Sequence, residues 1–456
     1  MTNSTILFAF IISLAVIIFT VVKLKLHPFL SLIIGSILMG ILSKMELTSI
    51  MENICSGFGG TMRDIGILIL LGVILGELLH VSGSTRNIAE MFLKALGIEN
   101  TPLAINLTGF LICIPVFFDA AFVILIGLVK QLSKEGKIPL NYLVCALSVG
   151  LTMTHAMVIP TPGPLAVAGT VGANIGWFIF YSIIVALPAS LLAGVVYGKY
   201  LGTKKPAWGD ALDEDDVIPK PAAKSSVPET KETASGQMGT FLILLPIILI
   251  IAGTMAKMTV DEHSSVYGLI DFLSNTNIIL LFTVFLAFIL LRRYITISFN
   301  DVVSNAAESV GSILAIICAG GGFGTVISAS GLGDFMVGGL QTMGIPVVVL
   351  AFVLCQTLRM GLGSITVSLV TTSAVLAPII AQTGVSPILA GLAICAGGIG
   401  LCMPNDSSFW TISKFSNFSF AETFRTLTIS GTIAGFSSFA LILVLSMFAN
   451  VLPGLH

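Results

Sequence analysis

Long apolar runs separated by short polar stretches fill most of the chain, and their lengths decide which elements they can form. A helix that crosses a bilayer needs about 20 mostly apolar residues. Ten segments meet this requirement when their ends are allowed to vary by a few residues. They predict membrane-spanning helices over residues 5–22, 28–43, 64–81, 142–170, 176–198, 239–256, 277–291, 311–329, 387–413 and 426–449.

Two further apolar stretches are interrupted at their centres and predict a different element. Residues 103–131 carry Pro115 and Asp119, and residues 345–380 carry Arg359 followed by two glycines. Non-helical backbone is tolerated at membrane depth only where it is buried in protein or faces a water-filled cavity. Each stretch is therefore expected to form a re-entrant hairpin of two half-helices.

Two of the ten spanning segments also contain a break. Residues 142–170 include the run IPTPGP at 159–164, and residues 387–413 include MPNDS at 403–407. Proline removes a backbone donor and clashes with the preceding turn, so an α-helix ends or kinks there. Both segments are expected to be broken helices.

The two halves of the chain resemble each other. Residues 76–83 (GELLHVSG) align with residues 324–331 (GTVISASG), and each match precedes a hairpin, a broken helix and a final span. We therefore predict an all-α polytopic membrane protein built from two repeats, with about ten transmembrane helices, two re-entrant hairpins and two broken helices. The repeats occupy residues 1–200 and 239–456, and a polar, proline-rich linker occupies residues 201–238.

The basic residues indicate how the chain is oriented. Cytoplasmic segments are enriched in Lys and Arg. With both termini outside and the 199–238 stretch cytoplasmic, only Lys44, Arg63 and Lys257 of the 21 Lys and Arg residues fall outside, and Arg359 falls in the second hairpin. The two hairpins then enter from opposite sides, so the repeats are inverted. Inverted repeats with paired helix breaks are typical of secondary transporters.

Composition excludes most other classes. The chain has 456 residues, of which 55% are hydrophobic and only 10% are charged, against about 25% charged in ordinary soluble proteins. A soluble enzyme or a nucleic-acid binder is therefore excluded. The seven cysteines form no CxxC pair, and no metal site is expected. Residues 331–334 (GLGD) look like the GxGD box of intramembrane aspartyl proteases. That chemistry needs a second aspartate, typically in a Tyr-Asp pair, and the sequence contains no such pair, so no enzyme is predicted.

The helix breaks are the predicted substrate site. They expose backbone N–H groups at the positive ends of half-helix dipoles, which favour anions. Hydroxyl and amide side chains beside them supply both donors and acceptors, which suits a hydroxylated organic acid. The predicted substrate-binding residues are Phe118, Asp119, Thr161, Pro162, Gly163, Gly363, Ser364, Thr366, Asn405, Asp406 and Ser407.

Ionisable residues inside the membrane are costly and usually functional. Asp119, Asp406 and His155 are the candidates for a coupling ion, either a proton or Na⁺. Capping or interhelical hydrogen bonding is the alternative role for the two aspartates. Arg359 could meet a substrate carboxylate or Asp406, or it could lie near the outer surface. No cofactor is expected.

Four motifs together resemble the gluconate permease (GntP-type) family. They are PVFFD at 115–119, His155 followed by PTPGPLA at 160–166, GSITV at 363–367 and NDSSFW at 405–410. The motifs occur in the order that the family has, and the resemblance covers nearly the whole chain.

The resemblance carries expectations about function. The family comprises bacterial inner-membrane symporters for gluconate and related sugar acids, generally taken to be proton-driven, and it includes D-serine permeases. The layout is also similar to divalent-anion/sodium symporters, which use an elevator motion, commonly as homodimers. A proton-coupled importer of gluconate or a related acid is therefore expected, working by an elevator-like mechanism as a homodimer in the lipid bilayer, with no nucleic-acid partner. The alternative is a D-serine-like amino-acid or sodium-coupled carboxylate transporter.

Overall fold

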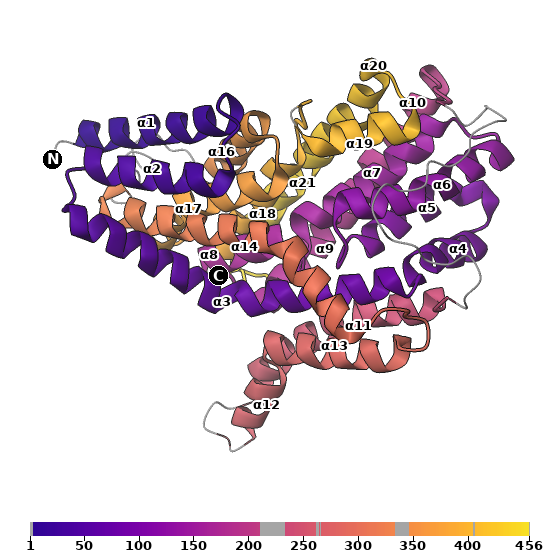
Figure 1. Ribbon diagram of the computed structural model, residues 1–456, viewed down its shortest axis with the longest axis horizontal. Helices are drawn as coiled ribbons and strands as arrows, with labels where there is room; N and C mark the ends of the chain where they lie inside the picture. The colour runs from indigo at the N-terminus through magenta and orange to yellow at the C-terminus, as the bar shows by residue number, and fades with distance from the viewer. Residues whose placement is uncertain are drawn as a thin grey trace.

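The computed structural model of the protein describes residues 3–209, 233–260, 264, 266–332, 346–404 and 406–455. Every regular element in these residues is a helix (Figure 1). The predicted all-α class is therefore confirmed. Most of the predicted linker, the beginning of the second hairpin and Asn405 lie outside the described residues.

The first half of the chain begins with three apolar helices, which are followed by seven further α-helices among the described residues. Their order is α1 (Asn3–Val22), α2 (Pro28–Leu42), α3 (Leu47–Val81), α4 (Ser84–Leu96), the short η1 (Ile98–Asn100), α5 (Thr101–Ile112), α6 (Phe118–Gly136), α7 (Leu140–Met157), α8 (Pro162–Val171), α9 (Ile175–Ser190), the π-helical turn η2 (Leu191–Val196) and α10 (Tyr197–Lys204).

The second half follows a similar order. It consists of α11 (Gly236–Thr259), α12 (Tyr267–Leu273), α13 (Thr276–Leu291), α14 (Phe299–Ala329), α16 (Val347–Leu362), α17 (Ile365–Thr383), α18 (Pro387–Ile399), α19 (Ser407–Ser416), α20 (Phe420–Thr423), the π-helical turn η3 (Phe424–Ile429) and α21 (Ser430–Met447).

Each of the ten predicted spanning segments contains a helix, but the number of full-length spans differs. By length and composition, seven helices in the described part of the chain can cross a membrane, or eight if the bent pair α12 and α13 counts as one span. Six of the ten predicted segments contain such a helix, and the seventh is α17, in the predicted second hairpin. The apolar stretches of α1 (Ile6–Val21), α2 and α18 have only 10–17 residues, and α13 qualifies only together with α12. A single long helix of about 20 residues is therefore not the unit from which this fold is built.

The helices α3 and α14 form the longest pairing in the molecule, and they run antiparallel across each other (Figure 1). Both begin earlier than predicted, at Leu47 and Phe299, and their first turns are mostly exposed, with Ile50 and Val302 as the first buried residues. Glycine allows the close approach: a Cβ atom at Gly57 would overlap the Thr325 Oγ1 and Gly321 O atoms. Small residues at helix crossings are the usual means of bringing backbones together in membranes.

The interrupted helices exchange partners between the halves. Helix α8 of the first half packs on α17 of the second, and α19 of the second packs on α6 of the first. Within each half, α5 packs on α7 and α16 packs on α18. The repeated pairings bring all four helix breaks toward the middle of the molecule.

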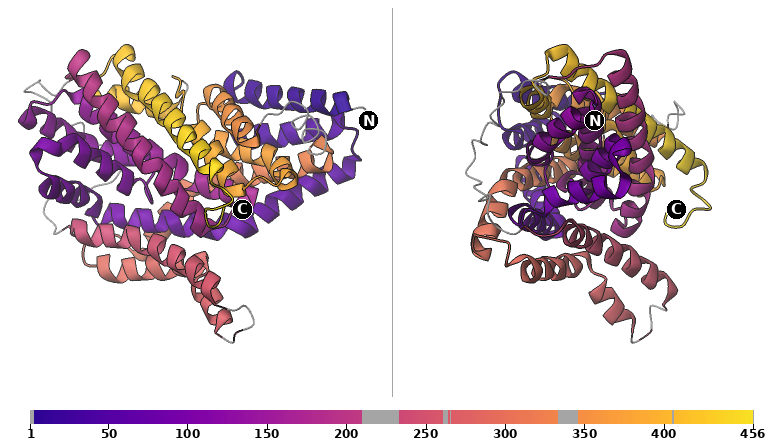
Figure 2. Two further views of the ribbon diagram at one scale, coloured as in Figure 1. Left: turned by 180° about the vertical axis from the view of Figure 1, so that it is seen from behind. Right: turned by 90° about the vertical axis from the view of Figure 1, so that its right-hand side faces the viewer.

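Burial separates a centre from a periphery. In the most apolar window of the α7–α8 segment 89% of residues are buried, against 33% for α11. Figure 2 shows α11, α12 and α13 as an outer layer set against the rest of the bundle. A helix that is apolar yet poorly buried by protein presents its surface to lipid, so the α7–α8 segment is the interior and α11 faces the bilayer.

Replacing Gly57 with alanine should destabilise the α3–α14 crossing. The added methyl group meets backbone that cannot move aside, and overpacking typically costs about 1–3 kcal/mol. Gly59→Ala is the matched control, because its Cβ atom would meet no described atom within 4 Å. Thermal unfolding of the purified protein in detergent measures both; equal midpoints for the two variants would refute the crossing as a tight contact.

Candidate functional site

Four interruptions separate half-helices at the centre of the molecule. They lie at residues 113–117, 158–161, 363–364 and 400–406. Three of them contain a proline, Pro115, Pro160 or Pro404, which lacks the N–H donor that the interior of a helix needs. At the remaining break, residues 363–364, Gly363 adopts a φ of 68°, the left-handed conformation that glycine allows at a helix C-terminus.

The helices that follow these breaks differ in whether a side chain accepts a hydrogen bond from the N–H groups of their first turn. The Ser364 hydroxyl accepts from the Val367 N–H at 3.4 Å, and the Asp406 carboxylate accepts from the Ser408 N–H at 2.7 Å. At the starts of α6 and α8 the described residues provide no side-chain cap. The Thr161 hydroxyl instead donates to Val158 O at 2.5 Å. Helix α6 therefore keeps free N–H groups in its first turn. The first turn of α8 contains Pro162 and Pro164, which have no N–H. Its Leu165 N–H bonds to Thr161 O, so only the Gly163 N–H is left there.

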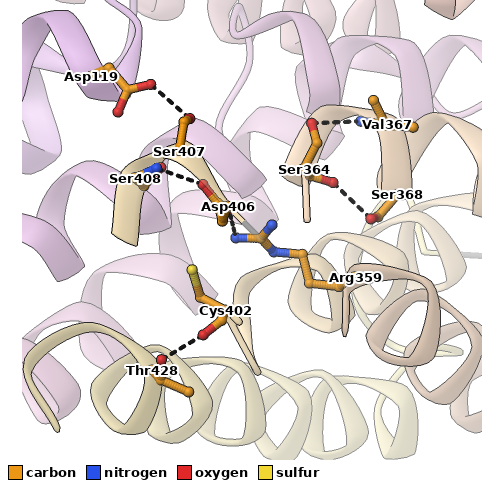
Figure 3. Close-up of polar contacts among 10 residues, drawn as sticks. All are labelled: Asp119, Arg359, Ser364, Val367, Ser368, Cys402, Asp406, Ser407, Ser408 and Thr428. Carbon is orange, nitrogen blue, oxygen red and sulfur yellow. Dashed lines mark hydrogen bonds and ion pairs between the residues drawn. The ribbon is translucent and has the colours of Figure 1, made fainter. Parts of the chain in front are cut away.

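A buried ion pair joins the second hairpin to the second broken helix. Arg359, in the last turn of α16, pairs with Asp406, the N-cap of α19 (Figure 3). Their side chains are 1% and 5% exposed. A charge this deeply buried is tolerated only when paired, so this contact fixes how the two elements meet.

The first hairpin reaches the same place through Asp119. The Ser407 hydroxyl donates to Asp119 Oδ2 at 3.1 Å, which ties the start of α6 to the start of α19. Figure 3 shows Asp119, Ser407, Asp406 and Arg359 in one row. Residues from both halves of the chain thus contribute to a single polar cluster.

Two further side chains support the broken backbone of the α18–α19 segment. The Thr428 hydroxyl donates to Cys402 O at 2.5 Å, and the Trp410 indole donates to Pro404 O at 2.7 Å. These bonds replace the partners that an unbroken helix would have provided. The interruption is therefore a defined conformation.

The remaining predicted residues lie nearby. A Cβ atom at Gly163 would lie 3.0 Å from Leu369 Cδ1 and 3.7 Å from Thr366 Oγ1, so the α8 and α17 N-termini adjoin each other. The His155 ring lies 6.4 Å from the Phe117 ring, centroid to centroid.

Of the predicted residues, the structure joins Asp119, Asp406 and Ser407 in the polar cluster, and Asp406 pairs with the Arg359 whose position the sequence left open. Asn405 lies outside the described residues. Sequence reasoning missed Gln356, which is 7% exposed and sits one turn before Arg359 on α16. Gln356 could have been found from its spacing of three residues from Arg359, which places both side chains on one face of the helix.

A cavity of about 400 Å³ lies between the α3–α14 crossing and the parts of α8 and α17 that are far from the breaks, and no residue of the polar cluster lines it. Its lining is small and hydroxylated, and Gly60, Thr61, Thr170 and Thr325 are typical of it. A second, much smaller pocket lies where α3 passes the first two breaks. Within the described ranges no cluster of His, Cys, Asp or Glu could hold a metal ion.

Broken helices that converge on buried charges, in a bundle of apolar helices, define a membrane transporter. Comparison with known proteins gives the family. The model of the GntP family permeases matches residues 5–448. The chain therefore belongs to the GntP permease family; it is a multi-pass membrane transporter and not an enzyme.

Individual relatives agree with this assignment. The chain is 31% identical to a gluconate permease of Pseudomonas aeruginosa over 94% of both chains, and 31% identical to the D-serine transporter DsdX of Escherichia coli over 93% of this chain and 94% of that one. Among solved structures, the YdaH transporter of Alcanivorax borkumensis shares the fold with a TM-score of 0.63 and 14% identity, covering 88% of this chain and 89% of that one.

Arg359→Gln should unfold far more easily than the wild type. Removing one partner leaves the Asp406 charge buried without compensation, which typically costs about 3–5 kcal/mol. The double variant Arg359→Gln/Asp406→Asn removes both charges and should recover much of the loss. The midpoint of thermal unfolding in detergent tests both variants, and a double variant as unstable as the single one would contradict a dominant role for the pair.

Proposed function

We propose that the protein is a symporter that imports gluconate or a closely related hydroxylated organic acid across the bacterial inner membrane. One observation carries the proposal: a buried arginine and the uncapped N-terminus of α6, both of which favour an anion, are linked through Asp406, Ser407 and Asp119. The gluconate permease among its relatives supports the same substrate class.

The geometry suits a substrate with one charged end and a hydroxylated body. The free N–H groups at the start of α6, the Gly163 N–H of α8 and the Arg359 guanidinium are donors for a carboxylate. Ser364, Thr366 and Ser407 offer hydroxyls that both donate and accept, as sugar hydroxyls require. Phe118, Pro162 and Gly363 belong to the same breaks and would shape the site.

Transport against a gradient needs a coupling ion, and we assign this role to the polar cluster. Asp119, Asp406 and His155 are the groups that could carry a proton there. Asp119 Oδ1 and His155 Nδ1 are buried, and no other atom in the described part of the chain gives them a hydrogen bond. Na⁺ is the alternative ion.

The proposal includes the arrangement in the membrane. The repeats at 1–200 and 239–456 are related by inversion, the hairpins at 103–131 and 345–380 are re-entrant, and segments 142–170 and 387–413 are the broken helices. Both termini face outside and the 201–238 linker is cytoplasmic. The antiparallel crossing of α3 and α14, which occupy corresponding places in the two halves, supports the inversion. A homodimer is expected from the similarity in architecture to dimeric symporters.

Alternating access would come from movement of the hairpin-bearing helices against α3 and α14, as in an elevator. The cavity supports this step because it lies along that boundary. Helix α3 lines the cavity through residues 56–65 and the small pocket at the breaks through residues 72–73. At 1.5 Å per residue these regions are about 10 Å apart. The cavity is thus the proposed vestibule between the breaks and the solution.

A D-serine-like amino acid is the second candidate substrate, because DsdX is as similar to the chain as the gluconate permease is. Its carboxylate would use the same donors. Its ammonium group would need an acceptor, and Asp119 Oδ1, which accepts no hydrogen bond from the described atoms, could serve.

Uptake into proteoliposomes tests the function. We expect labelled gluconate to accumulate when the outside is more acidic than the inside, with D-serine and succinate entering more slowly. A sodium gradient without a pH gradient should not drive accumulation. If all three compounds entered no faster than into empty vesicles, the proposed function would be wrong.

Gly60→Trp should stop transport without unfolding the protein. Gly60 lines the cavity, and a Cβ atom there would meet no described atom within 4 Å, so an indole could occupy the proposed vestibule. Gly59→Trp is the matched control, since its neighbourhood is equally open but it does not line the cavity. Normal uptake by the Gly60 variant at normal expression would exclude the cavity as the route.

A further inference from the structure

Four buried polar atoms on one face of α16 have no hydrogen-bond partner among the described residues. They are the Nε and Nη1 atoms of Arg359 and both amide atoms of Gln356. The two side chains are 1% and 7% exposed. Buried donors and acceptors are nearly always bonded, and leaving them unbonded costs free energy. A bound ligand is one partner that could supply these missing hydrogen bonds.

Both side chains point at the α18–α19 break. The Gln356 amide lies directly against Gly400, where a Cβ atom would be 2.7 Å from Nε2 and 2.8 Å from Oε1. Arg359 lies against Asp406 at the other end of the same break. The vacant hydrogen-bonding positions are thus in the polar cluster and not at the protein surface.

We propose that Arg359, assisted by Gln356, is the receptor for the carboxylate of the transported acid, and that Asp406 takes up one proton for each anion bound. This inference rests on the proposed function and deepens it. It gives the guanidinium a ligand in the loaded state, and it assigns the coupling proton to one of the three candidate groups.

Charge balance is the physical reason. In the state described here the positive charge of Arg359 is matched by Asp406, which also caps α19. A monovalent anion bound to Arg359 would leave two carboxylates beside one guanidinium. A buried, uncompensated negative charge is unfavourable in the low dielectric of a membrane protein. A proton transferred from solution to the Asp406 carboxylate restores neutrality.

The other groups that face Asp406 do not offer this compensation as directly. Asp119, from α6, is a second carboxyl group, which Ser407 ties to the start of α19, and Cys402 is a thiol in the same break. His155, from α7, also interacts electrostatically with both Asp406 and Arg359. A proton on His155 is therefore the outcome that competes with this assignment.

Calorimetry on the purified, detergent-solubilised full chain with gluconate as the probe tests the proposal. Titrations in buffers of different ionisation enthalpy give the number of protons taken up. We expect about one proton per gluconate in the wild type, so that affinity weakens by up to about tenfold per unit of rising pH. Added Na⁺ should change neither quantity.

Asp406→Asn separates the assignments. With Asn at 406 the guanidinium is matched by the substrate carboxylate alone, so gluconate should bind without proton uptake and with little dependence on pH. Continued uptake of one proton per gluconate by this variant would overturn the role of Asp406 and point to His155. Arg86→Gln, at an exposed site on α4, is the control and should match the wild type.

The double variant Arg359→Gln/Asp406→Asn tests the carboxylate receptor and keeps the site neutral in case the single arginine variant does not fold. Gluconamide, which has the hydroxyls of gluconate but no charge, is the comparison ligand. The wild type should prefer gluconate strongly, and the double variant should bind both compounds alike. A preserved preference for gluconate would refute Arg359 as the receptor. If the wild type itself bound neither compound, the proposed function would fail instead.

Discussion

A helix that breaks inside a membrane leaves backbone N–H and C=O groups without partners, and the rest of this structure depends on how those groups are satisfied. Lipid offers no hydrogen bonds, so the breaks have to face protein or water. Here they face one another, because α8 packs on α17 and α19 packs on α6. The exchange of helices between the two halves is thus a consequence of the breaks.

The ion pair between Arg359 and Asp406 meets a second constraint of the same kind. Asp406 caps α19 through the Ser408 N–H and pairs with Arg359 through its other oxygen. An asparagine could form the cap but could not neutralise the guanidinium. The carboxylate therefore serves local backbone structure and electrostatics together, which explains why this chain keeps a charge at a depth where charges are rare.

Much of the fold could be predicted because proline, glycine and apolar length act locally. The pattern placed a break near Pro115 and half-helices on either side, and α5 and α6 lie there. The lengths of α3 and α14 could not be predicted in this way. A hydropathy pattern detects only the apolar part of a helix that could lie in lipid. The more polar turns of α3 before residue 64 pack on another helix and line a cavity, so the pattern does not detect them.

The site residues, too, could be predicted where the signal is local and not where it depends on tertiary contact. The sequence singled out Asp119, Asp406 and Ser407 because polar residues at helix breaks are unusual, and the structure brings them together. It left the partner of Arg359 open, because the spacing of 47 residues between Arg359 and Asp406 carries no information about tertiary contact. Gln356 was missed because a single amide in an apolar helix looks like an ordinary substitution until its burial is known.

The position of the polar cluster relative to the cavity bears on how the protein could move. Arg359, Asp406 and Asp119 belong to α16, the N-cap of α19, and α6, which are all hairpin or broken-helix elements. The cavity lies on the boundary between such elements and the α3–α14 crossing, where the lining residues are small. If the hairpin-bearing helices move as one body, the ion pair travels with them intact. Displacement across that boundary would then open no buried charge to lipid, and the cost of burying the pair would be the same at both ends of the movement.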